Sequence, residues 1–193
     1  MRRTLILAIL SGALVVPSTS WAQDSGANTP GPTTPVTSTD RERVALLLGA
    51  YHELPDQATF LAASPRARDV LVGMAGDAQL FPPHRVRALD ALARYWNGPE
   101  PFNLLASWLS DANTRDTTRH DLITLAARRF GNASVPLIAP YLRHADLQLR
   151  LTTVHALDLV DTEDAMDQLE AALAKETSTV VREAIEKATL QVR

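Results

Sequence analysis

The sequence predicts an all-α fold, an α-solenoid of about four to five antiparallel helix hairpins stacked side by side. Apolar residues recur at spacings of three and four through most of the chain, the period of helices that each bury one face. A set of helix features also returns about every thirty residues, which is typical of repeat proteins. No segment alternates apolar and polar residues for long enough to indicate a sheet.

The N-terminus has the composition of a secretory signal peptide, which we assign to residues 1–22. Two arginines near the start precede an apolar run, Leu5 to Val16, and small residues follow it. This run is short for a membrane span, so we expect cleavage after Ala22 and no span in the mature protein. The mature protein is then expected in the periplasm or outside the cell. A buried N-terminal helix is the alternative interpretation.

A polar segment separates this leader from the folded part. Residues 23–39, QDSGANTPGPTTPVTST, are rich in Pro, Ser and Thr and have no apolar residue at helical spacing. Such a segment buries too little surface to offset the entropy of ordering it, so we expect a disordered linker. The helical repeat domain is expected to cover residues 40–193, a usual size for one domain. Its oligomeric state does not follow from the sequence.

Composition argues against several kinds of chemistry. The chain has no cysteine, which excludes disulfides, cysteine-bound zinc and a thiol nucleophile. It has no glycine-rich phosphate loop and no His-Glu-x-x-His motif, so we expect no metal, no cofactor and no catalytic residue. Without residues 1–22 the chain has 17 basic and 22 acidic residues, and a net charge of −5 disfavours nucleic acid as a partner.

The repeat shows best in a column of basic residues that we expect to form a ladder along the stack. The column residues, separated by 33, 30 and 32 positions, are Arg87, His120, Arg150 and Arg182. Six residues after each of them comes an alanine: Ala93, Ala126, Ala156 and Ala188. Their small side chains are expected to let neighbouring helices approach closely. Four residues before each comes a residue that starts helices: Pro83, Asp116, Asp146 and Ser178.

Each of these helices follows another amphipathic segment, which gives the hairpins. The preceding helices are expected at 66–76, 101–112, 135–144 and 163–175. Asp40, Val44 and Ala50 fit the same frame, but the next unit then begins 43 residues later. The first unit is therefore expected to contain an insertion or an extra short helix.

The second helices resemble those of HEAT-like repeats. The residues that carry the resemblance are Val181-Arg182-Glu183-Ala184 with Ala188, and Leu149-Arg150 with Ala156-Leu157. The resemblance covers residues 83–193 well and 40–82 poorly, and His120 departs from it because the other column positions are Arg. Some HEAT-like repeat proteins are bilin lyases, so an enzyme or enzyme subunit of lyase type, acting on a protein-bound substrate, is the alternative function.

The favoured function is an exported interaction scaffold or adaptor of a bacterial cell envelope, without catalysis of its own, that binds another envelope or secreted protein. Positions one, five and eight after each column residue place a mixture of aromatic, charged and apolar side chains on one side of the second helices. From this row we select Tyr95, Arg128 and His155 as candidate partner-binding residues. In the alternative, Leu92 and Leu125 are buried by the next unit and the row is ordinary surface. A purely structural spacer is a third possibility.

Overall fold

A computed structural model describes residues 36–49 and 53–190. The predicted signal peptide and most of the predicted linker lie outside the described residues. Within them the chain is helical throughout, without a strand, so the all-α prediction is confirmed. The elements are α1 (Ser38–Leu48), α2 (Gln57–Ala63), α3 (Ala67–Gly76), α4 (Pro82–Tyr95), α5 (Glu100–Ser110), α6 (Asp116–Phe130), η1 (Gly131–Ser134), α7 (Val135–Ile138), η2 (Ala139–Arg143), α8 (Leu147–Val160), α9 (Glu163–Leu173) and α10 (Thr179–Leu190).

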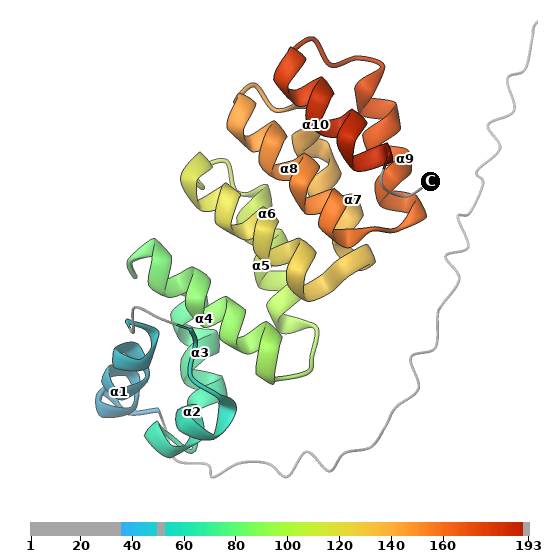
Figure 1. Cartoon of the computed structure of the whole chain (residues 1–193). Helices are drawn as coiled ribbons and strands as arrows, with labels where there is room; N and C mark the ends of the chain where they lie inside the picture. The colour runs from blue at the N-terminus through green and yellow to red at the C-terminus, as the bar shows by residue number, and fades with distance from the viewer. Residues whose placement is uncertain (1–35, 50–52, 191–193) are drawn as a thin grey trace, which may run out of the picture. The chain divides into compact units, whose positions relative to one another are not determined.

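The helices form two layers of a stack. The second helices of successive hairpins, α4, α6, α8 and α10, lie side by side in one row (Figure 1). The first helices, α3, α5, α7 with η2, and α9, form the layer behind this row. Helix α1 packs against α3 and α4, and α2 is the short extra helix that the spacing of the first unit predicts.

Helix α1 begins two residues before the predicted start of the domain at residue 40. Thr37 and Asp40 form a capping box, in which the Thr37 hydroxyl accepts from the Asp40 amide at 3.1 Å. The Asp40 carboxylate in turn accepts from the Thr37 amide at 3.1 Å. Two amide groups that the first helical turn leaves without partners are thereby satisfied, which fixes the start of the helix.

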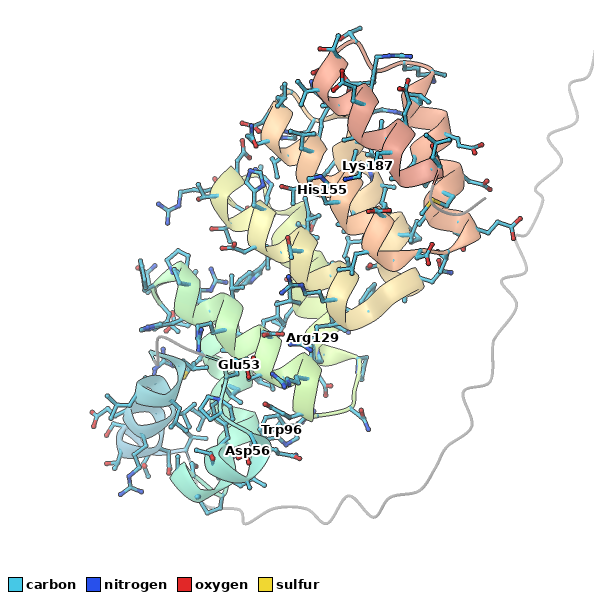
Figure 2. All side chains as sticks on the ribbon, viewed as in Figure 1. Glu53, Asp56, Trp96, Arg129, His155 and Lys187 are labelled. Carbon is cyan, nitrogen blue, oxygen red and sulfur yellow. The ribbon has the colours of Figure 1, made fainter. Side chains whose placement is uncertain are left out.

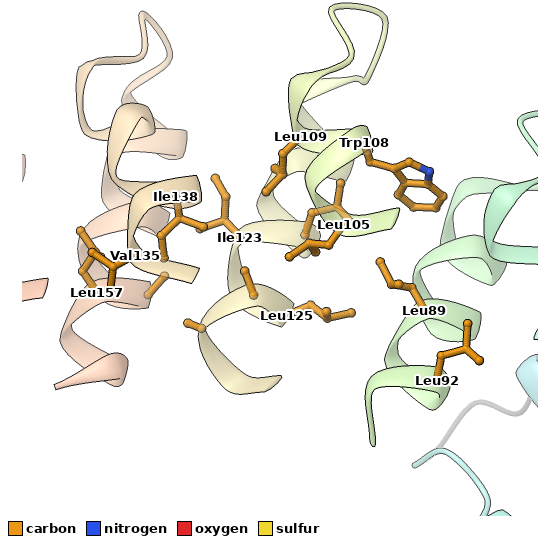
Figure 3. Packing of buried hydrophobic residues seen from close by; sticks show 14 of the residues in the cluster. Leu89, Leu92, Leu105, Trp108, Leu109, Ile123, Leu125, Val135, Ile138 and Leu157 are labelled. Atoms are coloured by element: carbon orange, nitrogen blue, oxygen red, sulfur yellow. The ribbon is translucent and has the colours of Figure 1, made fainter. Parts of the chain in front are cut away.

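The core follows the seam between the layers. Leu105 and Leu109 of α5 reach between the second helices and meet Leu89 and Ile123 (Figure 3). All four are at most 3% exposed. Burying a leucine side chain stabilises a fold by about 1.5–3 kcal/mol, so a seam of such residues holds each hairpin against the next. No hairpin buries its apolar face alone, as the repeat interpretation requires.

An arginine recurs at one position in α1 and in every second helix, four residues after the residue that precedes the helix. Beginning with α1, the arginine column is Arg41, Arg85, Arg119, Arg150 and Arg182. The last four each donate a hydrogen bond to a backbone carbonyl at or just beyond the end of the preceding helix. The acceptors are Ala75 for Arg85, Asp111 for Arg119, His144 and Ala145 for Arg150, and Leu173 and Glu176 for Arg182. Those carbonyls lack helical partners and lie at the negative end of the helix dipole, so a guanidinium suits them.

Three members of the arginine column also reach the next hairpin. Arg41 pairs with Asp77 at 2.5 Å, and the Arg85 guanidinium carbon lies 3.7 Å from the ring centre of Trp108. Arg150 pairs with Glu176 at 2.9 Å. Burial lowers the pKa of Arg85, whereas the charges of Asp77 and Asp111 act to raise it. Arg85 and Arg150 therefore connect the two helices of a hairpin and link that hairpin to its neighbour, whereas Arg41 links α1 to the turn after α3.

The arginine column differs from the predicted ladder in α4 and α6, where the prediction named Arg87 and His120 in place of Arg85 and Arg119. The difference arises because α4 and α6 begin earlier in the sequence than predicted. Helix α4 follows Phe81 and begins at Pro82, and α6 follows Arg115, so Pro83 and Asp116 are not the residues that precede the helices. Asp116 makes no capping bond and instead pairs with the guanidinium of Arg119 at 2.8 Å. His120 Nδ1 lies 2.6 Å from the Thr152 hydroxyl of α8.

The earlier start of α4 also explains the one exception in the predicted alanine column. Ala126, Ala156 and Ala188 are buried, but Ala93 is partly exposed. In α4 the position six residues after the column arginine is Ala91, which has no exposed surface. Three of the four predicted alanines thus lie inside the stack, and Ala93 does not.

The first helix of the third hairpin is not the continuous helix predicted over 135–144. It consists of η1, the four-residue α7 and η2, with Pro136 and Pro140 inside it. Proline has no amide hydrogen and clashes with the preceding turn, so two prolines four residues apart prevent a regular helix here. The Tyr141 hydroxyl donates to the Leu109 carbonyl of α5 at 2.5 Å and holds the irregular segment to the neighbouring hairpin.

Candidate functional site

Two grooves run along the row of second helices. The first lies between α4 and α6 and has a volume of about 330 Å³. The second lies between α6 and α8 and has a volume of about 360 Å³. The first groove is lined by Pro83, Val86, Arg87, Asp90, Asp121, Thr124, Leu125, Arg128 and Arg129. The second is lined by Thr124, Arg128, Thr152, His155, Ala156, Asp158 and Leu159.

The repeat places similar positions of each helix at the grooves. Counted from the column arginine, positions two, five and nine of α6 are Asp121, Thr124 and Arg128, and those of α8 are Thr152, His155 and Leu159. Spacings of three and four put these side chains on one side of a helix. Residues of α6 line both grooves, because this helix lies between α4 and α8.

One ion pair joins the two walls of the first groove. Arg129 of α6 donates through Nε to the Asp90 carboxylate of α4 at 2.5 Å, and both side chains are about one-quarter exposed. Figure 2 shows Arg129 at the boundary between these two helices. This pair is satisfied within the chain, so it closes the groove and offers little to a partner.

Arg128 and Asp121 differ from this pair. Both are exposed in the groove walls, and neither has a hydrogen bond or ion pair among the described residues. Loss of hydration raises the pKa of Asp121, and the nearby charge of His120 opposes the shift without cancelling it. A partly desolvated carboxylate without a donor in the described part of the chain can accept a hydrogen bond from an incoming group.

The three predicted partner-binding residues do not lie together. Arg128 and His155 are both exposed and line the groove between α6 and α8. Tyr95 is half-buried at the end of α4, outside both grooves, with its ring centre 6.3 Å from Phe60 and 6.1 Å from Trp96. Figure 2 places Trp96 beside the N-terminal helices and His155 far along the row. Tyr95 thus contributes to the packing of α2 on α4.

Leu92 and Leu125, two of the apolar members of the predicted row, are buried. The alternative considered for these two residues is therefore correct. The prediction missed Leu159, which is 56% exposed beside Arg128, and Thr124, which lines both grooves. Counting from the true start of α6 selects Thr124, at position five. Leu159 lies at position nine of α8, one residue beyond the last position of the predicted row.

Two further properties concern the described part of the chain as a whole. Within residues 36–49 and 53–190 no group of three or more His, Asp or Glu side chains is placed to hold a metal ion. None of the helices in these ranges is both long and apolar enough to cross a membrane.

Comparison with known proteins agrees with this architecture. The family model described as HEAT repeats matches residues 115–189, from the start of α6 to within α10. Over these residues the hairpins are similar to HEAT repeats. The match contains the second groove and one wall of the first. HEAT repeats typically mediate protein–protein interaction, and the two grooves lie on the row formed by their second helices. No curated protein matches the chain.

Proposed function

We propose that this chain is an exported protein-binding scaffold of a bacterial cell envelope, and that the two grooves along α4, α6 and α8 are its docking surface. The observation that carries the proposal is Arg128, an exposed guanidinium that lines both grooves and is unpaired among the described residues. The family match supports a protein as the ligand. The protein is proposed to act by holding a partner in place, with no reaction of its own.

The composition of the grooves favours a protein segment over a small metabolite. Each groove lies between two neighbouring second helices and is lined by charged, hydroxyl and apolar side chains. Such mixtures are typical of protein interfaces, in which arginine is enriched. Charge is also uneven along the chain. Residues 158–193 hold nine acidic and four basic residues, so the excess of negative charge lies mainly beyond the residues that line the two grooves.

Export is tested by the mass of the mature protein. The full chain, produced with its own N-terminus in a Gram-negative host, is expected in the periplasmic or extracellular fraction with Gln23 as its first residue. Intact-mass spectrometry gives the cleavage site directly. A matched variant, Leu7→Arg, breaks the apolar run and is expected to stay in the cytoplasm uncleaved. Uncleaved wild-type protein in the cytoplasm would contradict the proposal.

The docking surface is tested by site-specific photo-crosslinking in the intact envelope of the native organism. A photoreactive residue at His155 is expected to give a discrete adduct with another envelope protein. The control places the same residue at Gln168, an exposed position of α9 in the other layer. Arg128→Ala, combined with the probe at 155, is expected to reduce the adduct about tenfold, since the loss of one charged anchor commonly costs that much affinity.

The outcomes of this experiment separate clearly. Adducts of equal yield from positions 155 and 168 would mean that the second helices are not the docking surface. Absence of any adduct from position 155, in cells where the protein is exported and folded, would contradict the proposed function itself. Circular dichroism of each variant checks that the helices remain intact.

A further inference from the structure

Two exposed side chains with different chemistry line the groove between α6 and α8. Arg128 is exposed and unpaired among the described residues, and Leu159 is 56% exposed. Both lie near the C-terminal ends of their helices and line the same groove, with Ala156 between the helices as its small buried base. An exposed leucine alone needs no explanation, but one in the same groove as an arginine that is unpaired among the described residues offers an apolar contact and a charged one to the same ligand.

The chemistry of Arg128 specifies an anion. A guanidinium offers five donors in a planar fork, which matches a carboxylate through two parallel hydrogen bonds. No carboxylate of the described chain occupies this position, although Asp90 satisfies the neighbouring Arg129. Asp158 also lines the groove, and its negative charge disfavours a second acidic group next to the first. Leu159 offers an apolar contact instead.

We propose that the groove between α6 and α8 binds a segment of the partner protein in which a single Asp or Glu stands beside an apolar residue. The carboxylate pairs with Arg128, and the apolar side chain packs on Leu159. Thr124, Thr152 and His155 line the rest of the groove and supply polar contacts to the backbone of the segment. This inference rests on the proposed function, since it names the chemistry of the partner that the scaffold holds.

The test is selection of random displayed peptides on the purified mature protein. Three forms are compared: wild type, Arg128→Glu and the matched control Arg143→Glu. Arg143 is also exposed and has no hydrogen bond or ion pair among the described residues, but it lies in η2, in the other layer. Wild type and the control are expected to enrich peptides with one acidic residue next to an apolar one. Arg128→Glu is expected to lose these peptides and to enrich basic ones instead.

Affinity of one enriched peptide, measured by fluorescence anisotropy, makes the result quantitative. Arg128→Glu is expected to weaken binding at least about tenfold, because a repulsive pair replaces a bidentate one, while Arg143→Glu leaves it unchanged. Replacing the acid of the peptide by Lys is expected to restore binding to Arg128→Glu. Leu159→Ser is expected to weaken binding and to remove the preference for an apolar neighbour.

Several results would overturn the inference. Enriched peptides without an acidic residue, or peptides whose binding ignores Arg128→Glu, would show that the groove reads another chemistry while docking on this face still stands. Failure of wild type to enrich any peptide would also refute recognition of a short segment. If crosslinking from position 155 succeeded in that case, the proposed function would survive and the partner would be recognised by its folded surface.

Discussion

Replacing Arg150 by alanine is expected to lower the free energy of unfolding by about 3–5 kcal/mol, the usual cost of removing one partner of a buried ion pair. The Arg150 side chain is 15% exposed and that of Glu176 is 7% exposed. Alanine would leave Glu176 without its counter-charge and the carbonyls of His144 and Ala145 without their donor. Urea unfolding followed by circular dichroism measures the loss.

Arg182→Ala is the matched control, because Arg182 occupies the same position of the arginine column in α10. Its charge partner, Glu186, lies 3.6 Å away, and both side chains are 42–50% exposed. Exposed pairs contribute little, so the expected loss is about 1 kcal/mol, mostly from the hydrogen bonds to Leu173 and Glu176. Equal losses in the two variants would mean that the pair with Glu176 contributes nothing beyond the capping of the helix.

The pH dependence of the Arg150 variant identifies the charge pair. Burial acts to raise the pKa of Glu176, but the amide of Ser178 and the charge of Arg150 outweigh it and hold the pKa below the ordinary value of 4.5. A carboxylate with a depressed pKa stabilises the fold above the ordinary value and loses this contribution as the pH falls through the folded value. The difference between wild type and Arg150→Ala is therefore expected to shrink as the pH falls below 4.5.

The fold could be predicted because it rests on features that recur many times. Each hairpin has its own apolar stripe. When one position is assigned to the wrong place in the pattern, the period of about thirty residues can still be recognised from the others. The register could not be read as safely, because it depends on where a helix starts. Pro83 and Asp116 are good starting residues, yet Phe81 and Arg115 precede the helices. Backbone and tertiary contacts override the preference of one side chain for a capping position.

The position of each helix start also explains why some of the predicted partner-binding residues line a groove and others do not. Helix α8 has a capping Asp146 that marks its start, so His155 was counted from the correct residue and faces the groove. In α4 the frame was displaced by two residues, and Tyr95 fell on the side that packs against α2. Arg129 pairs with Asp90 of α4, whereas Arg128 has no ion pair among the described residues. This difference depends on which helices become neighbours, so the sequence alone does not distinguish the two adjacent arginines.

Phe60→Ala is expected to cost about 3–5 kcal/mol, the range for truncating a fully buried phenylalanine. Phe60 is the buried residue of α2, and its ring lies 6.3 Å from Tyr95 and 6.4 Å from Trp96. A helix of seven residues is not stable by itself in water, so α2 depends on this contact. We therefore expect α2 to detach, with hydrogen exchange at residues 57–63 rising well before exchange in α8.

Leu61→Ala tests whether the effect comes from the aromatic contact. Leu61 is the next residue of the same helix and is 43% exposed, so its truncation is expected to change stability by less than about 0.5 kcal/mol. Tyr95→Ala should mimic Phe60→Ala in part, because it removes the other side of the contact, and should leave the photo-crosslink from position 155 unchanged. Loss of that crosslink in folded Tyr95→Ala protein would return Tyr95 to the docking surface and contradict a structural role.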